Sequence, residues 1–189
     1  MRKVIVIYGL LSGAIAIFSV WFIATLCDKG LVGLDHTELV GYASFVIASS
    51  MIFFGIKSYR DNYGNGSIKF WKGVQIGVLI TLIASLMYFA GGELYTIANP
   101  NFQESFTQKY IDYQTTKMKE KGIPQEEIYK ANKATIDMMY IAKNNVLVRF
   151  ALAMVEFLPV GIIITLISAS ILRKQHILPT APNAAISVS

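Results

Sequence analysis

Two carboxylates inside apolar stretches of the sequence, Glu93 and Glu156, are the residues best placed to do chemistry. A charged group near the centre of a membrane helix costs about 2–3 kcal/mol, so it is expected to face a bundle interior or water. Glu93 lies 21 residues after Lys72, and Glu156 lies 17 residues before Arg173. On antiparallel helices this spacing predicts that the two carboxylates lie within about 6 Å of the same depth. Two such acids could share a proton, with one pKa raised, as in a proton-linked carrier or channel.

A structural role for Glu156 is the alternative. Tyr88, Tyr95 or a serine or threonine on a neighbouring helix could donate a hydrogen bond to it, and Arg149, seven residues earlier, lies on roughly the same helix face. Pro159 leaves one carbonyl of the preceding turn without its usual donor, which predicts a kink and local polarity. Both roles stay open at this point. The candidate intramembrane polar residues are Glu156, Glu93, Pro159, Arg149 and Tyr88.

Other catalytic patterns are missing from the sequence. The two histidines, His36 and His176, have no second ligand at a spacing that suits a metal ion. No phosphate-binding glycine loop, nucleophile elbow or His/Glu zinc motif is present. A lipid-modifying enzyme would need clustered polar residues at the interface, and we find none beyond the two acids. We therefore expect no catalytic residues, no metal, no cofactor and no enzymatic activity.

The composition indicates a membrane protein. Of 189 residues, 54% are hydrophobic and 15% are charged, whereas soluble domains carry about 25% charged residues. A helix needs about 20 apolar residues to cross a bilayer. Four long apolar stretches predict spans at about 4–26, 39–57, 71–95 and 146–172. The expected fold is an all-α four-helix transmembrane bundle, forming a single membrane domain over residues 1–176.

The first stretch could instead be a signal peptide, because Arg2 and Lys3 precede it. Its apolar run is longer than the 7–15 residues of a typical signal peptide, and no small-x-small cleavage site follows. We expect it to be retained as a span. Cys27 suggests a lipoprotein, but the bulky Leu26 stands where a small residue is required, so we do not expect lipidation.

The distribution of charge predicts the orientation. Only one acid, Asp61, accompanies eight basic residues on one flank of the predicted spans: Arg2, Lys3, Lys57, Arg60, Lys69, Lys72, Arg173 and Lys174. The positive-inside rule then places both termini and the loop 58–71 in the cytoplasm of a bacterium, with the protein in its inner membrane. We expect the excess positive charge, +5 overall, to interact with anionic lipid headgroups at the cytoplasmic face. Nucleic acid is therefore not an expected partner.

The segment of about 101–143, between the third and fourth spans, predicts an extracytoplasmic helical hairpin. Phe102, Phe106 and Tyr110 recur every four residues, which is typical of one face of a helix, and Gly122 suits its end. Pro124 then suits the start of a second helix. The turn-rich residues 61–67 predict a loop, and the uncharged tail 177–189 is expected to be disordered.

Small residues recur every four positions in each span. Gly9 and Gly13 lie in the first span, Gly73 and Gly77 continue to Thr81 and Ser85 in the third, and the fourth has Gly161, Thr165 and Ala169. Because lipid gives no hydrophobic reason for helices to associate, close backbone approach through small residues is expected to hold the bundle together. Dimerisation through one such stripe, association with another membrane protein and a substrate path are the alternatives.

Three segments together resemble a known family. They contain GYASFVIASSMIFFGIKSYRDN at 41–62, GVLITLIAS at 77–85 followed by Tyr88 and Glu93, and EFLPVG at 156–161. The sequence resembles the bacterial membrane proteins of domain of unknown function 4199. The resemblance implies a four-pass protein of the cytoplasmic membrane, and it implies no activity and no functional residues. Gly91 and Gly92 depart from the family, which tends to be bulkier there, and we expect them to loosen the third helix.

These patterns together predict an integral membrane protein that acts as a structural or accessory component of the cell envelope. The alternative is a small proton-linked carrier or channel that works as an oligomer through Glu156 and Glu93, because four helices alone rarely enclose a path.

Overall fold

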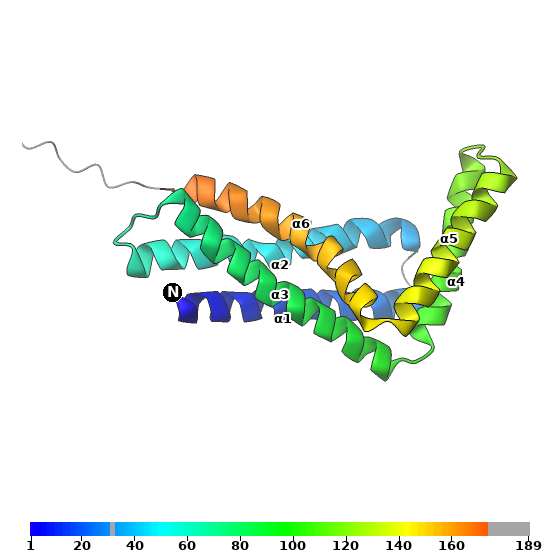
Figure 1. Cartoon of the computed structure of the whole chain (residues 1–189), viewed down its shortest axis with the longest axis horizontal. Helices are drawn as coiled ribbons and strands as arrows, with labels where there is room; N and C mark the ends of the chain where they lie inside the picture. Colours follow the sequence, from blue (N-terminus) through cyan, green and yellow to red (C-terminus); the bar gives the residue numbers. More distant parts are fainter. Residues whose placement is uncertain (31–32, 174–189) are drawn as a thin grey trace, which may run out of the picture.

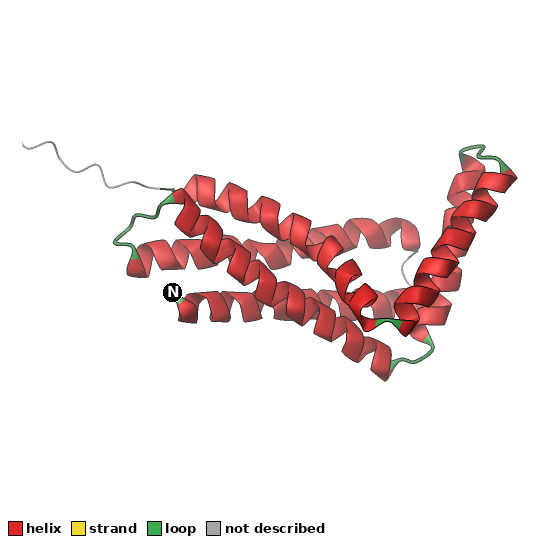
Figure 2. Cartoon of the chain, in the orientation of Figure 1, coloured by secondary structure: helices red, strands yellow, loops and turns green. Residues whose placement is uncertain are grey.

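The computed structural model describes residues 1–30 and 33–173, and helices are the regular structure of these residues (Figure 2). The helices are α1 (Arg2–Asp28), α2 (Leu34–Tyr63), α3 (Phe70–Ala98), α4 (Phe102–Glu120), α5 (Gln125–Asn144) and α6 (Val146–Leu172). The prediction of an all-α fold is confirmed. The tail 177–189 and His176 lie outside the described residues.

Four of the six helices are long and apolar enough to cross a membrane. They are Arg2–Cys27, Leu39–Tyr63, Phe70–Ala98 and Val146–Leu172, each longer than the roughly 20 residues that a bilayer requires. The chain therefore has the helices of a multi-pass membrane protein. The remaining two, α4 and α5, form a hairpin at one end of the bundle, opposite the end that holds the N-terminus (Figure 1).

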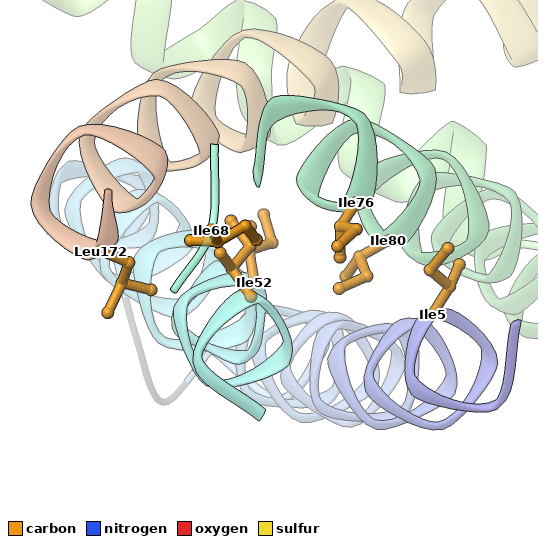
Figure 3. Packing of buried hydrophobic residues seen from close by; sticks show 7 residues of the cluster. Ile5, Ile52, Ile68, Ile76, Ile80 and Leu172 are labelled. Atoms are coloured by element: carbon orange, nitrogen blue, oxygen red, sulfur yellow. The ribbon is translucent and has the colours of Figure 1, made fainter. Parts of the chain in front are cut away.

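Each of the outer pair α1 and α6 packs against both α2 and α3. Isoleucines fill the half of the bundle near the N-terminus, with Ile52, Ile76 and Ile80 fully buried between the helices (Figure 3). Nearer the hairpin, a second buried cluster contains Ala16, Ala48, Ala84 and Phe157. Bulky side chains therefore fill one half of the core, and mostly small ones fill the other, where they let the helices approach closely.

The two small-residue stripes of α3 and α6 pack against each other. A Cβ on Gly73 would lie 3.1 Å from the Cβ of Ala169, and a Cβ on Gly77 would lie 2.5 Å from Cγ2 of Thr165. Gly161 is in equally close contact with Thr81. In each pair the two residue numbers add up to 242. The helices are antiparallel, so a position four residues later in α3 contacts a position four residues earlier in α6. We call this contact the α3–α6 seam: Gly73, Gly77, Thr81, Gly161, Thr165 and Ala169.

The glycines of α1 receive bulky side chains from α3. A Cβ on Gly9 would lie 2.8 Å from Ile83, and a Cβ on Gly13 would lie 2.6 Å from Met87. Here the small residues serve as holes for large side chains, as in ordinary helix packing. All five packing glycines named from the sequence therefore lie at helix–helix contacts within the chain.

Two local expectations were wrong. Residues 61–63 belong to α2 and not to a loop, because Asn62 donates to the carbonyl of Ser58 and Gly64 continues the backbone hydrogen bonds by donating to Arg60. The glycine pair of α3 does not loosen that helix, which continues to Ala98. Gly91 is packed against Ile17, and its carbonyl accepts a hydrogen bond of 2.9 Å from Nε1 of Trp21.

Candidate functional site

An ion pair between two spans joins Glu93 of α3 to Arg149 of α6. Nε of Arg149 donates to Oε1 of Glu93 at 2.6 Å, and Nη2 donates to Oε2 at 2.8 Å. This two-bond fork is the arrangement in which a guanidinium binds a carboxylate most strongly. The side chains are 24% and 26% exposed, so the pair is largely shielded. The position numbers again sum to 242, so this ion pair continues the register of the α3–α6 seam.

Arg149 also contacts the hairpin. Its Nη1 donates to the carbonyl oxygens of Ala142 at 2.9 Å and Lys143 at 3.0 Å, both in the last turn of α5. The last carbonyls of a helix have no partner within the helix, and a cation there also interacts favourably with the helix dipole. One guanidinium therefore joins α3, α5 and α6.

Glu156 is held separately, about half-way along α6. The hydroxyl of Tyr88 donates to its Oε2 at 2.7 Å, which is one of the partners proposed from the sequence. The Tyr88 ring stacks on Phe157 and meets Phe45 edge-on, with ring centroids 5.7 and 5.3 Å apart. This aromatic cluster links α2, α3 and α6 directly beside the carboxylate.

Glu93 and Glu156, the two acids that could have shared a proton, each have a different partner in the structure. Counting residues from the ends of the spans put them within about 6 Å in depth, but the observed register places Glu93 level with Arg149. Glu156 lies seven residues further along α6, or about 10 Å. Arg149, which shares a helix face with Glu156, binds Glu93 across the seam instead.

Polar contacts and aromatic rings attach the hairpin to the spans. Nζ of Lys109 donates to the carbonyl of Cys27 at 3.0 Å, and Nζ of Lys143 donates to Glu104 at 2.7 Å. The hydrogen bond from Lys143, followed by its charge, lowers the pKa of the Glu104 carboxyl. A row of rings in successive contact runs from α1 to the hairpin: Trp21, Tyr95, Phe102, Phe106 and Tyr110.

A cavity of about 860 Å³ lies between the ends of the spans and the hairpin. Glu93, Arg149, Tyr88 and Glu156 line it, together with apolar side chains of α1, α2 and both hairpin helices. The volume falls within the range of about 300–1,000 Å³ that small-molecule sites occupy. Among the described residues no group of three or more His, Cys, Asp or Glu side chains could hold a metal ion.

Four of the five candidate polar residues line this cavity, and they form two contacts rather than one cluster. Pro159, the fifth, lies within α6, which continues through it as helix. Sequence reasoning missed the contacts of Trp21, Lys109 and the Glu104–Lys143 pair. No periodicity reveals these contacts, since each joins segments that only the folded chain brings together.

Comparison with known proteins identifies one family. The family model described as "Protein of unknown function (DUF4199)" matches residues 7–174, which is most of the chain. The search of curated proteins and the search of solved structures each returned no match.

Proposed function

This chain belongs to DUF4199, a protein family of unknown function, and from that premise we propose that it is a structural or accessory membrane protein without enzymatic activity. Its role is to hold the α4–α5 hairpin in a fixed position on one side of the membrane. The observation that carries this proposal is the three-way contact of Arg149 with Glu93 and with the last carbonyls of α5.

The polar side chains of the spans support a joining role. Glu93 is neutralised by Arg149, and Glu156 accepts a hydrogen bond from Tyr88, so each carboxylate connects α6 to α3. A proton relay that runs through both acids would need them to exchange protons with each other. These two carboxylates instead have separate partners at different levels of the bundle.

We further propose that the hairpin is extracytoplasmic and that both termini are cytoplasmic, in a bacterial inner membrane. The N-terminus, the α2–α3 loop and the end of α6 gather at one end of the bundle, and the hairpin is at the other (Figure 1). The first end carries a strong excess of positive charge, which would meet anionic headgroups there. Its basic residues are Arg2, Lys3, Lys57, Arg60, Lys69, Lys72 and Arg173, with the acid Asp61 among them, whereas the lysines of the hairpin are interspersed with acids. The partner that we propose for these basic residues is therefore the lipid surface and not nucleic acid.

Hydrogen exchange tests the joining role. In Arg149→Ala, the amides of α5 should exchange faster than in the unchanged chain, because the hairpin loses its link to the bundle, whereas the isoleucine core should stay protected. Lys130→Ala is the matched control, since Lys130 pairs with Glu126 of the same helix and is 69% exposed. Equal protection of α5 in all three proteins would refute the joining role.

Cysteine labelling tests the orientation. In a Cys27→Ala background, Lys119→Cys on the hairpin should react with a membrane-impermeant maleimide applied to intact spheroplasts. Asn62→Cys, at the other end of the bundle, should react only after lysis. The reverse pattern would overturn the proposed topology.

A proton-linked carrier or channel remains the second candidate, because Glu156 lines the cavity. In that case Glu156→Gln would abolish a pH-dependent activity while the chain still folds. A joining role predicts instead that glutamine, which can still accept from Tyr88, leaves folding and stability unchanged, and that leucine or lysine disrupts folding.

A further inference from the structure

The charges that line the cavity do not balance. Glu93 is paired with Arg149, and Glu104 is paired with Lys143. Glu156 accepts from Tyr88, whose hydroxyl is neutral, and the ion pairs found among the described residues do not include it. The cavity therefore contains one carboxylate whose charge has no counterion in this part of the chain.

The position of Glu156 limits what could supply the missing charge. It lies ten residues after Val146, about 15 Å from the hairpin end of α6. The surface that lines the cavity around it is mostly apolar, with side chains from α1, α2 and both hairpin helices. An occupant whose charge reaches Glu156 must therefore place the rest of its surface against apolar side chains.

The surroundings of Glu156 suit an organic cation. Phe45 and Tyr88 both line the cavity, and their rings lie at 85° to each other. Aromatic faces attract cations, and the attraction is stronger where water is excluded. A carboxylate beside aromatic rings in an apolar cavity is therefore suited to a cation whose charge is carried by an apolar body.

We propose that this cavity binds a lipophilic monovalent organic cation, with the cationic charge next to Glu156 and the apolar body against Phe45 and Tyr88. This binding goes beyond the structural role and rests on the cavity alone. A chain that fixes its hairpin but binds no such cation would overturn this inference and leave the proposed function intact.

Two ions of matched shape and opposite charge provide the test. Equilibrium dialysis of the purified full chain in a non-ionic detergent should show saturable binding of tetraphenylphosphonium. Tetraphenylborate should bind at least about tenfold more weakly, because a like charge next to Glu156 is unfavourable. Equal binding of the two ions, or no saturable binding by the folded chain, would overturn the proposal.

Substitution of the carboxylate tests its role. Glu156→Gln keeps the acceptor for Tyr88 and removes the charge, so tetraphenylphosphonium affinity should fall at least about tenfold. Glu127→Gln, an exposed carboxylate of α5 outside the cavity, should bind as the unchanged chain does. Unchanged binding by a folded Glu156→Gln protein would overturn the proposal.

A cavity-filling variant gives an independent result if Glu156→Gln does not fold. Gly92 lines the cavity, and a Cβ placed on it would meet no atom within 4 Å, so Gly92→Phe can fill the space without a clash at the backbone. Binding should be lost while the circular dichroism spectrum is kept.

A competition experiment separates the proposed ligand from a lipid headgroup. Added phosphatidylethanolamine should not displace tetraphenylphosphonium from the unchanged chain. Displacement would assign the cavity to a lipid amine and overturn our assignment.

Discussion

Glu93 and Arg149 lie opposite each other at the end of the α3–α6 seam, three steps of four residues beyond the contact of Thr81 with Gly161. Their two hydrogen bonds, 2.6 and 2.8 Å long, close the seam on the side of the hairpin. The close packing of small residues and the ion pair are thus parts of one antiparallel contact, because both follow the same four-residue repeat.

Breaking this ion pair should weaken the fold. Arg149→Ala should lower the free energy of unfolding by about 2–3 kcal/mol, because Glu93 is left without its partner in a largely shielded position. Arg149→Lys should recover only part of the loss, since an ammonium cannot form the fork. Reversible unfolding in mixed micelles measures both values.

A double-mutant cycle with Glu93→Ala should give a coupling above about 1 kcal/mol for this pair. The exposed pair of Lys130 and Glu126 is the matched control, and its coupling should be below about 0.5 kcal/mol. Similar couplings for the two pairs would show that the Glu93–Arg149 contact does not stabilise the bundle.

The seam should not tolerate added volume. Gly77→Ala should cost about 1–3 kcal/mol, because the new Cβ would lie 2.5 Å from a methyl group of Thr165 and would force the helices apart. Gly92→Ala, on the same helix, meets open space and should stabilise by up to about 1 kcal/mol through better helix propensity. Comparing the midpoints of unfolding for the two variants measures the difference, and equal effects would contradict the seam.

The hydroxyl of Tyr88 should matter only while Glu156 is present. Tyr88→Phe should cost about 1–3 kcal/mol, since the carboxylate loses its hydrogen-bond donor in an apolar setting. With Glu156→Ala already in place, the same change should cost less. These four unfolding free energies form a cycle, and a cost for Tyr88→Phe that is independent of residue 156 would refute the contact.

The Glu104–Lys143 pair predicts a pH dependence. Because the pKa of Glu104 is lower in the folded chain than in the unfolded chain, the pair favours folding above the unfolded pKa of about 4.5. This contribution is lost as the pH falls through the folded pKa. Carboxyl ¹³C shifts should show Glu104 titrating at lower pH in the unchanged chain than in Lys143→Ala. Identical titration midpoints would refute the pairing.

The sequence by itself determined the helices and their faces. Long runs without charged residues predict membrane-spanning helices, because in a helix every backbone group can find its hydrogen bond within the segment. The stripe of Gly73 and Gly77 likewise followed from a period of four residues, as did the row of Phe102, Phe106 and Tyr110. Each of these features is a property of one segment.

Only the tertiary structure decided which residues meet. Periodicity shows that Arg149 and Glu156 share a face of α6, but it does not give the axial register of α6 against α3. Arg149 and Glu156 are seven residues, or about 10 Å, apart along α6. This separation is enough for Arg149 to bind Glu93 while Glu156 binds Tyr88. The register is set by the sum of many contacts between two helices, so no local pattern contains it. The cavity has the same origin, because it is bounded by side chains from all six helices.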